Sequence, residues 1–255
     1  MIQDTDPSPI VFDIETAGLP NAADYLEPIP DAVPDESPIE ADKRLTDPVK
    51  VAADIEKKQA ARAEQNAAAQ AKVEQQRAAR LEKTSLDWNV GRIVALAWWT
   101  ERDGYAVRVC RDEAAERSAL IEFWRESRYR TLIGFNAKGF DLKFMVQRSR
   151  LLGIAHPILD FSKYTRKGIA DIYLDLTFNE GTYDQGAMRR TLHAFCRRFG
   201  IPVPDGVTGA EIPRLVAAGE WDAVSKHVMS DVFLTCELAA RLNLIPEVER
   251  AGIAV

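Results

Sequence analysis

The stretch PIVFDIETAGLP, residues 9–20, decides both the fold and the chemistry expected of this chain. The apolar run at residues 10–12 is typical of a buried strand, and Asp13 and Glu15 follow it on alternate positions. Because side chains alternate between the two faces of a strand, both carboxylates point to the same face. Neighbouring carboxylates repel each other, and a divalent cation is the usual way to stabilise such a pair.

Length, composition and charge limit the classes of protein that fit. The chain has 255 residues, 46% hydrophobic and 28% charged, which suits one large domain or a domain with an appendage. The N-terminus does not resemble a signal peptide, and no apolar run approaches the length of about 18 residues that spans a membrane. The three cysteines form no CxxC pair, so a disulfide framework or zinc site is disfavoured. We expect a cytoplasmic protein without a membrane partner.

The net charge of −6 argues against a protein that coats nucleic acid by electrostatics alone. It leaves open an enzyme that meets nucleic acid through metal ions and a local basic patch.

A long segment after the first strand differs in composition from the rest. Residues 18–47 are rich in Pro and Asp and predict a loop, whereas residues 48–85 consist mainly of strong helix formers. Asp47 suits an N-cap and Pro48 the first helical position. The apolar stripe is thin, which favours a solvated helix or helical hairpin, with a coiled-coil or partner-binding arm as the alternative. We therefore expect a single domain over 1–255, with residues 18–88 as an inserted loop and helical arm.

The remaining pattern predicts a mixed α/β domain whose sheet is covered by helices. Strands are expected at 91–100 and 104–110 as a hairpin, and at 131–136, with a further apolar segment at 170–176. Helices are expected at 112–128, 138–154, 188–201, 209–220 and 221–243.

Acidic residues recur at two further places that the predicted fold can bring together. Asn136 ends a short strand, and Asp141 follows early in the next helix. His227 and Asp231 are four residues apart, so they share one face of a helix. Each acid has a structural explanation by itself, such as an interaction with a helix terminus. Four buried acids from three segments would still need compensation, which two metal ions roughly 4 Å apart supply.

The set DIET, GFNAKGFD and HVMSD resembles the three motifs of the DEDD 3′–5′ exonuclease superfamily, which has a ribonuclease-H-like fold. The branch it resembles most is the one related to the proofreading domain of family B DNA polymerases. RTLHAFCRRFGIP and SDVFLTCELAARL also resemble the segments around the third motif. The resemblance covers about residues 8–16 and 90–245 and leaves out the inserted arm.

The resemblance implies that Asp13, Glu15, Asp141 and Asp231 hold two Mg²⁺ or Mn²⁺ ions. It also implies that His227, four residues before the last acid, orients or deprotonates the attacking water. One subclass has Tyr at that spacing and the other has His five residues before the acid, so this chain departs from both. Histidine is a good general base near neutral pH, which keeps the arrangement workable.

Substrate contacts are expected from residues beside these motifs. The resemblance places Asn136 next to the substrate, and Thr16 is the last residue of the first motif. Phe140 can wedge against a terminal base or pack in the core. In YTRKG, residues 164–168, Tyr164 offers a stacking face and Arg166 a positive charge. Other basic residues that can guide a phosphate backbone are Lys138, Lys143, Arg148, Lys163, Lys167, Arg189 and Arg190. Asp171 and Asp175 are interpreted as acids that flank a strand.

These inferences predict a two-metal 3′–5′ exonuclease that releases nucleoside 5′-monophosphates from a nucleic-acid 3′ end, in DNA replication or repair. DNA is favoured over RNA as substrate. The arm would bind a polymerase, a helicase or a second copy of the chain. One alternative is a catalytically silent module that binds nucleic acid or a replication partner. Another is a phosphatase with a strand-end aspartate as nucleophile, although Glu15 stands where that chemistry needs a second aspartate.

Overall fold

The computed structural model describes residues 8–162, 167–178 and 190–247. The chain divides into two compact units, one made of residues 1–20 and 84–255 and the other of residues 21–83. The first unit contains the sheet and all of the predicted acidic motifs, and the second contains the long helix.

A five-stranded mixed sheet forms the centre of the first unit, with the order β3-β2-β1-β4-β5. β1 pairs antiparallel with β2 and parallel with β4, β2 pairs antiparallel with β3, and β4 pairs parallel with β5. The strands span Ile10–Gly18 (β1), Gly91–Thr100 (β2), Gly104–Val109 (β3), Leu132–Gly134 (β4) and Ile169–Asp171 (β5). The strand that carries Asp13 and Glu15 therefore lies in the middle of the sheet.

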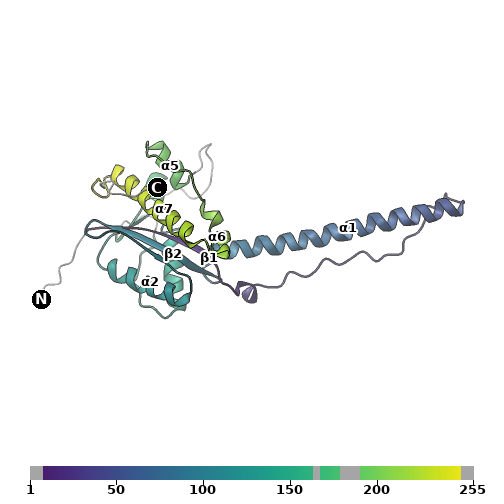
Figure 1. The fold of residues 1–255 in the computed structure, drawn as a ribbon, viewed down its shortest axis with the longest axis horizontal. Coiled ribbons are helices and arrows are strands. Elements are labelled where there is room, and N and C mark those ends of the chain that lie inside the picture. Colours follow the sequence, from purple (N-terminus) through teal and green to yellow (C-terminus); the bar gives the residue numbers. More distant parts are fainter. Residues whose placement is uncertain (1–7, 163–166, 179–189, 248–255) are drawn as a thin grey trace. The chain divides into compact units, whose positions relative to one another are not determined.

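Helices cover both faces of this sheet (Figure 1). One face packs on α2 (Glu113–Glu126) and α3 (Asp141–Leu151), and the other packs on α7 (Trp221–Arg241) and the short helices before it. Alternation along β1 assigns the residues to the faces: Phe12 belongs to the cluster with α2, and Val11 to the cluster with α7. Asp13 and Glu15 have the parity of Val11, so they face α7.

The remaining helices of this unit are short. They are α4 (Ile172–Leu176), α5 (Leu192–Arg198), the 3₁₀ turn η3 (Gly209–Glu211) and α6 (Ile212–Ala218). The helix predicted at 188–201 begins instead at Leu192, where Thr191 caps it, and residues 188–189 lie outside the described part. The helix predicted at 138–154 begins at Asp141 and ends at Leu151. None of the helices in the described residues combines the length and apolar character that a membrane span requires.

A buried ion pair joins the two helices on the α2 face. Arg148 donates from Nε and Nη2 to Glu116 at 2.8 and 2.7 Å, and Glu116 also accepts from the backbone N–H of Ile93 at 2.9 Å. Both side chains are almost fully buried. The suggestion that Arg148 guides a phosphate backbone is therefore wrong, because this guanidinium neutralises a core carboxylate.

The second unit is one 35-residue helix, α1 (Pro48–Glu82), with an extended segment along it. The N-cap prediction is confirmed, since Asp47 accepts from the N–H of Val49 at 2.9 Å. A single helix replaces the alternative of a helical hairpin, and none of its residues is buried. The extended segment is held by hydrogen bonds from loop N–H groups to α1 side chains, such as Ala32 to Gln70 at 3.0 Å. The short 3₁₀ turns η1 (Ala22–Tyr25) and η2 (Lys83–Leu86) flank these segments.

Candidate active site

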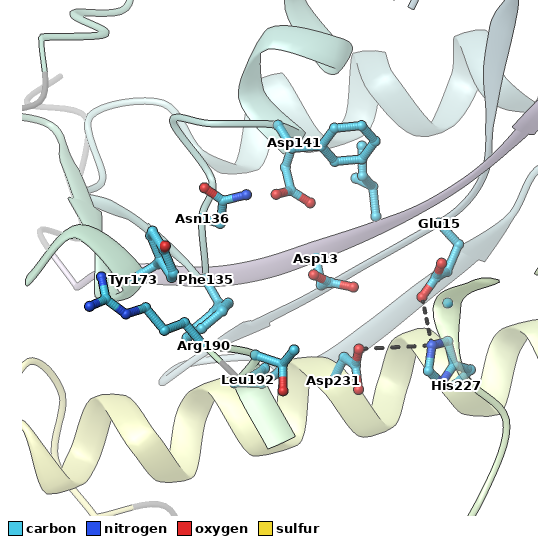
Figure 2. A pocket seen from close by; sticks show the side chains of 14 residues that line it. Asp13, Glu15, Phe135, Asn136, Asp141, Tyr173, Arg190, Leu192, His227 and Asp231 are labelled. Carbon is cyan, nitrogen blue, oxygen red and sulfur yellow. Dashed lines mark ion pairs between the residues drawn. The ribbon is translucent and has the colours of Figure 1, made fainter. Parts of the chain in front are cut away.

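The centre of the site is the carboxyl half of β1. The ladder with β2 shifts register between Glu15, which pairs with Ala95, and Thr16, which pairs with Ile93. Val94 is thus the extra residue of a β-bulge, and bulges increase local twist and re-aim neighbouring side chains. Glu15 is buried and directed at α7, with Asp13 beside it on the same strand (Figure 2).

Helix α7 supplies the facing wall. His227 and Asp231 are one turn apart on the side that packs against β1, as their spacing predicts. His227 Nε2 lies 3.2 Å from Glu15 Oε1 and 3.9 Å from Asp231 Oδ2. One potential ligand atom from each of these three residues lies within 4.8 Å of the other two. Residues more than 200 positions apart in the chain therefore meet in one cluster.

Asp141 reaches the same cluster from the first turn of α3, and its carboxylate accepts a hydrogen bond from the backbone of Ile14. The pairing of β1 with β4 covers only Ile10 and Val11, so the later residues of β1 have no partner on β4 and the N–H of Ile14 is left for Asp141. Figure 2 shows the carboxylates of Asp141, Asp13 and Asp231 directed into one space. The four predicted acids thus come together from three elements.

The loop between β4 and α3 explains where α3 begins. Asn136 has a left-handed backbone (φ 59°), which Asn tolerates, and a Cβ on Gly139 would lie 2.2 Å from Asn136 Oδ1. Asp171 accepts from the N–H groups of Asn136 and Lys138 at 3.1 and 2.8 Å. These bonds hold residues 136–140 in a turn, so the helix starts at Asp141. Asp171 is therefore a structural residue that shapes the loop next to the site.

The electrostatics of the cluster are unfavourable without added positive charge. Burial, together with Asp141, Asp231 and Glu15, raises the pKa of Asp13 well above its usual value. Burial and the charges of Asp231 and Asp141 likewise raise the pKa of Glu15, and burial raises the pKa of Asp141 to about 7. Desolvation and like charge both disfavour the ionised carboxylate. The cluster holds protons more tightly than exposed acids do.

Two histidines line the cluster, one of which the sequence reasoning missed. Burial lowers the pKa of His227, partly offset by Asp231, so its imidazole is neutral at neutral pH. His193, on α5, places Nε2 3.3 Å from Asp231 Oδ1. It lies in RTLHAFCRRFG, the segment that leads to the third motif, and not in one of the three motifs themselves. Helical periodicity places it on an α5 face but does not indicate that this face meets Asp231.

The cavity at the cluster has a volume of about 600 Å³. Its walls combine the acids with aromatic side chains and a few polar groups. They are Asp13, Ile14, Glu15, Phe135, Asn136, Phe140, Asp141, Tyr173, Arg190, Thr191, Leu192, Gly209, His227 and Asp231. Of these described lining residues, Arg190 is the one with a permanent positive charge, and Figure 2 shows it extending away from Glu15 and His227. The acids are therefore not neutralised by a nearby arginine or lysine in the described lining.

The predicted substrate residues fall into three groups. Asn136 and Phe140 line the cavity, and the Phe140 ring also packs on Phe144 at 5.5 Å. Thr16 does not face the cavity: it is buried, and its hydroxyl donates to the carbonyl of Ser85 at 2.6 Å. The opposite parity of Thr16 on β1 explains this misplacement. Tyr164 and Arg166 lie outside the described residues.

Lys138 is also placed differently from the expectation that it guides phosphate. It is buried, and its Nζ donates to the carbonyl of Ser162 at 2.6 Å.

The donor set suits hard divalent cations. Carboxylate oxygens from Asp13, Glu15, Asp141 and Asp231 are the ligands that Mg²⁺ and Mn²⁺ prefer, and no cysteine lines the described cavity. Positive charge placed among the carboxylates would remove the repulsion that, together with burial, raises the pKa values of Asp13, Glu15 and Asp141. The residues present therefore fit a divalent-metal site.

Fold and site together define an α/β domain with an acidic cluster at the centre of a mixed sheet. A family described as a predicted 3′–5′ exonuclease related to the exonuclease domain of PolB matches residues 84–247, more than half of the chain. The chain belongs to this family. The match begins after the arm, so it leaves out Asp13 and Glu15, which the structure supplies by inserting β1 between β2 and β4.

A solved structure supports the same fold. The family B DNA polymerase from the hyperthermophilic archaeon Pyrobaculum calidifontis matches with a TM-score of 0.52 and 20% identity. The alignment covers 64% of this chain and 23% of the polymerase, so the chain corresponds to a small part of that enzyme. The predicted ribonuclease-H-like fold and the resemblance to the polymerase exonuclease branch are confirmed. A comparison with curated proteins gives no match.

Proposed function

We propose that this protein is a divalent-metal-dependent 3′–5′ exonuclease that releases nucleoside 5′-monophosphates from nucleic-acid ends. The observation that carries the proposal is the convergence of four acids from three elements on one cavity, with Glu15 and Asp141 buried and Asp13 and Asp231 half-buried, where they repel one another. A structural role does not require such an arrangement, because uncompensated buried charge destabilises a fold. A pair of cations turns the same arrangement into a phosphoryl-transfer site.

Asp13, Glu15, Asp141 and Asp231 would hold the metal ions. When bound, two such ions supply Lewis acids that activate water and neutralise charge developing on the phosphate and the leaving 3′-oxygen. Asp13 is at the middle of the cluster in Figure 2, so its carboxylate would be among the ligands that hold the metal. The bulge beside Glu15 orients the Glu15 carboxylate, and the hydrogen bond from the N–H of Ile14 orients that of Asp141.

His227 would act as the general base. Its imidazole is buried against Glu15 and Asp231, and burial keeps it neutral at neutral pH, so Nε2 is able to take a proton from an attacking water. His193 would act as a positioning residue. Its contact with Asp231 Oδ1 holds one carboxylate oxygen and leaves Oδ2 on the side of His227.

The cavity suits the terminal nucleotide of a single strand. Phe135, Phe140 and Tyr173 provide apolar and aromatic surface for a base, and Asn136 offers hydrogen bonds next to Asp141. A volume of about 600 Å³ is of the size that encloses one small ligand. A 3′ end that frays or is already single-stranded is therefore the expected substrate, with DNA favoured over RNA.

Residues 21–83 would act as an inserted arm in this exonuclease domain rather than as a part of its catalytic core. The 35-residue helix has no buried residue, so it contributes little to a hydrophobic core. A polymerase, a helicase or a second copy of the chain would bind it, and such a partner would place the enzyme in DNA replication or repair.

The test is hydrolysis of single-stranded oligonucleotides labelled at either end, in DNA and RNA versions, with Mg²⁺, with Mn²⁺ and with EDTA. The proposal expects stepwise shortening from the 3′ end, release of nucleoside 5′-monophosphates, and no cleavage in EDTA. Binding without cleavage under every metal condition would instead establish a catalytically silent module. Release of inorganic phosphate irrespective of strand polarity would establish a phosphatase.

A further inference from the structure

A second cavity lies at the opposite edge of the sheet from the acids. It has a volume of about 820 Å³ and is bounded by α2, by the turn after α2 and by residues 153–159. Leu132, which begins β4, lines it, whereas Asn136 and Asp141 at the acidic cluster follow the carboxyl end of that strand. The length of β4 alone separates the two cavities by about 10 Å. This second cavity is therefore distinct from the candidate active site.

The cavity is strongly basic in an acidic protein. Arg117, Arg125, Arg128 and Arg130 line it, no described lining residue is acidic, and the whole chain carries a net charge of −6. Arg117, Arg125 and Arg128 are exposed, with Arg125 also paired with Glu126 at 3.1 Å, whereas Arg130 is buried and donates to the carbonyl of Glu126 at 2.9 Å. We call this cavity, with its four arginines and Tyr129, the arginine pocket. Its charge favours a polyanionic ligand.

An exposed aromatic ring lies at the rim. Tyr129 is 67% exposed, and the guanidinium of Arg128 lies 4.9 Å from its ring centroid. Tyr129 also has a left-handed backbone (φ 68°), which is strained for a bulky side chain and which glycine adopts freely. The contact with Arg128 is the one ring contact recorded for Tyr129 among the described residues, and most of the side chain is exposed, so the ring is available to a ligand.

The rest of the wall continues this surface along α2. Arg117, Ile121 and Arg125 are four residues apart, so they form one stripe on the helix, and Ile121 is 45% exposed. Attraction to the helix dipole accounts for arginines near the C-terminus of α2, such as Arg125 and Arg128. Arg117, one turn from the N-terminus, donates instead to the carbonyl of Leu152 at 2.5 Å, at the end of α3. Its side chain remains exposed beside this bond, so the stripe still presents positive charge to a ligand.

We propose that the arginine pocket binds a single-stranded segment of nucleic acid, with the arginines on phosphates and Tyr129 stacked on a base. Basic grooves with interleaved aromatic side chains bind single strands in this way, largely independently of sequence. An acidic protein segment would use the arginines but would leave the strained Tyr129 unexplained. The inference goes beyond the proposed exonuclease activity, because it concerns binding at a separate surface and holds whether or not cleavage occurs.

The test measures binding without hydrolysis. Fluorescence anisotropy would follow 5′-labelled single strands of DNA and RNA of one sequence, in EDTA, with the Asp13→Asn protein as the parent. In the double variant Arg125→Gln/Arg128→Gln, we expect affinity to fall about tenfold and the slope of log K against log salt to become shallower by about 1.4. An equal loss of affinity for the DNA strand and the RNA strand would show that the protein recognises the phosphates rather than the sugar.

Tyr129 separates binding from folding. Tyr129→Gly removes the ring at a backbone that glycine prefers, so we expect an unchanged or higher Tm together with about tenfold weaker binding. Tyr129→Phe keeps the stacking face and is expected to bind like the parent. A Tyr129→Gly protein that binds normally would overturn the stacking role.

A matched control tests whether overall charge is responsible. Lys50→Gln/Lys57→Gln removes the same charge from exposed positions on α1 and is expected to leave affinity within about twofold of the parent. The proposal is overturned if this control weakens binding as much as the arginine variant. It is also overturned if the arginine variant, with its Tm intact, binds as tightly as the parent.

Discussion

The carboxylates of the arm and those of the sheet have opposite environments. On the arm, Arg44 donates to Asp42 and lowers its pKa to about 2, and Lys58 lowers the pKa of Asp54. At the sheet, burial raises the pKa of Asp141 to about 7, and burial with neighbouring acids raises those of Asp13 and Glu15. The arm supplies its acids with cations from its own side chains, whereas the sheet leaves its acids to repel one another.

This difference indicates what each region is for. Exposed ion pairs contribute little to stability and leave a long helix soluble. Buried acids without counter-charge destabilise the metal-free fold, so a function must retain them. The comparison predicts that mutations in the acidic cluster trade activity for stability, while changes to the arm leave catalysis unaltered.

Asp13→Asn should have the largest effect. Removing the central charge is expected to lower kcat/KM on a 3′-labelled oligonucleotide by at least about a thousandfold, because a metal ligand is lost. The same substitution removes a repelling buried charge, so the Tm of the metal-free protein should rise. Thermal melts in EDTA check the expected rise in Tm, and single-turnover assays in Mn²⁺ check the expected loss of activity. A variant with normal activity would refute the metal site.

His227→Gln should come next. Glutamine retains a hydrogen-bonding group near Glu15 but cannot accept the proton, so we expect kcat to fall by about 10²–10⁴-fold with little change in KM. The wild-type rate should fall at low pH as His227 becomes protonated, and this fall should be absent from the pH profile of the variant. If the residual activity keeps the same fall, another group is the base.

His193→Ala is expected to have a smaller effect, a loss of about 10- to 100-fold in Mn²⁺ affinity or rate, because the contact orients Asp231 rather than reacting. His193→Gln places an amide N–H near the same oxygen and should restore part of the loss. Calorimetric Mn²⁺ titrations of the two variants decide the matter. If His193→Ala and His193→Gln lose Mn²⁺ affinity equally, His193 has a role other than this hydrogen bond.

Replacing residues 21–83 with a short Gly/Ser linker should have the smallest effect. The arm forms its own compact unit and α1 has no buried residue, so the Tm and the rate on short oligonucleotides should stay within about twofold. Circular dichroism melts and the 3′-end assay are sufficient. Unfolding of the shortened protein would show that the arm is structural.

The sequence was sufficient to predict the local structure of most elements. Alternation in IVFDIET placed Asp13 and Glu15 on one strand face, and the four-residue spacing placed His227 and Asp231 on one helix face. Asp47 and Pro48 marked the start of α1 through capping chemistry. These predictions rest on periodicity and terminal hydrogen bonds, which adjacent residues determine.

Contacts between distant segments were not predictable in the same way. The contact of His193 with Asp231 depends on how α5 packs beside α7, and the role of Asp171 depends on its reach to the loop of Asn136. In the sequence Arg148 looks like any basic residue that could bind phosphate, and only its bond to Glu116 in the fold shows that it does not. Thr16 ends the DIET motif directly after Glu15, but strand parity directs its side chain away from the cavity.

Titration of the protein with Mn²⁺ by calorimetry, at about pH 6 and pH 8, tests the central claim most directly. A raised carboxyl pKa means that the folded, metal-free protein binds protons that the unfolded chain releases, so its stability falls as pH rises from about 4 towards about 7. Metal must displace those protons, so affinity should increase with pH and binding should release protons at the lower pH. The account predicts two Mn²⁺ per chain in the wild type and loss of this binding in Asp13→Asn. Absence of Mn²⁺ uptake at pH 8, or uptake unchanged in Asp13→Asn, would contradict it.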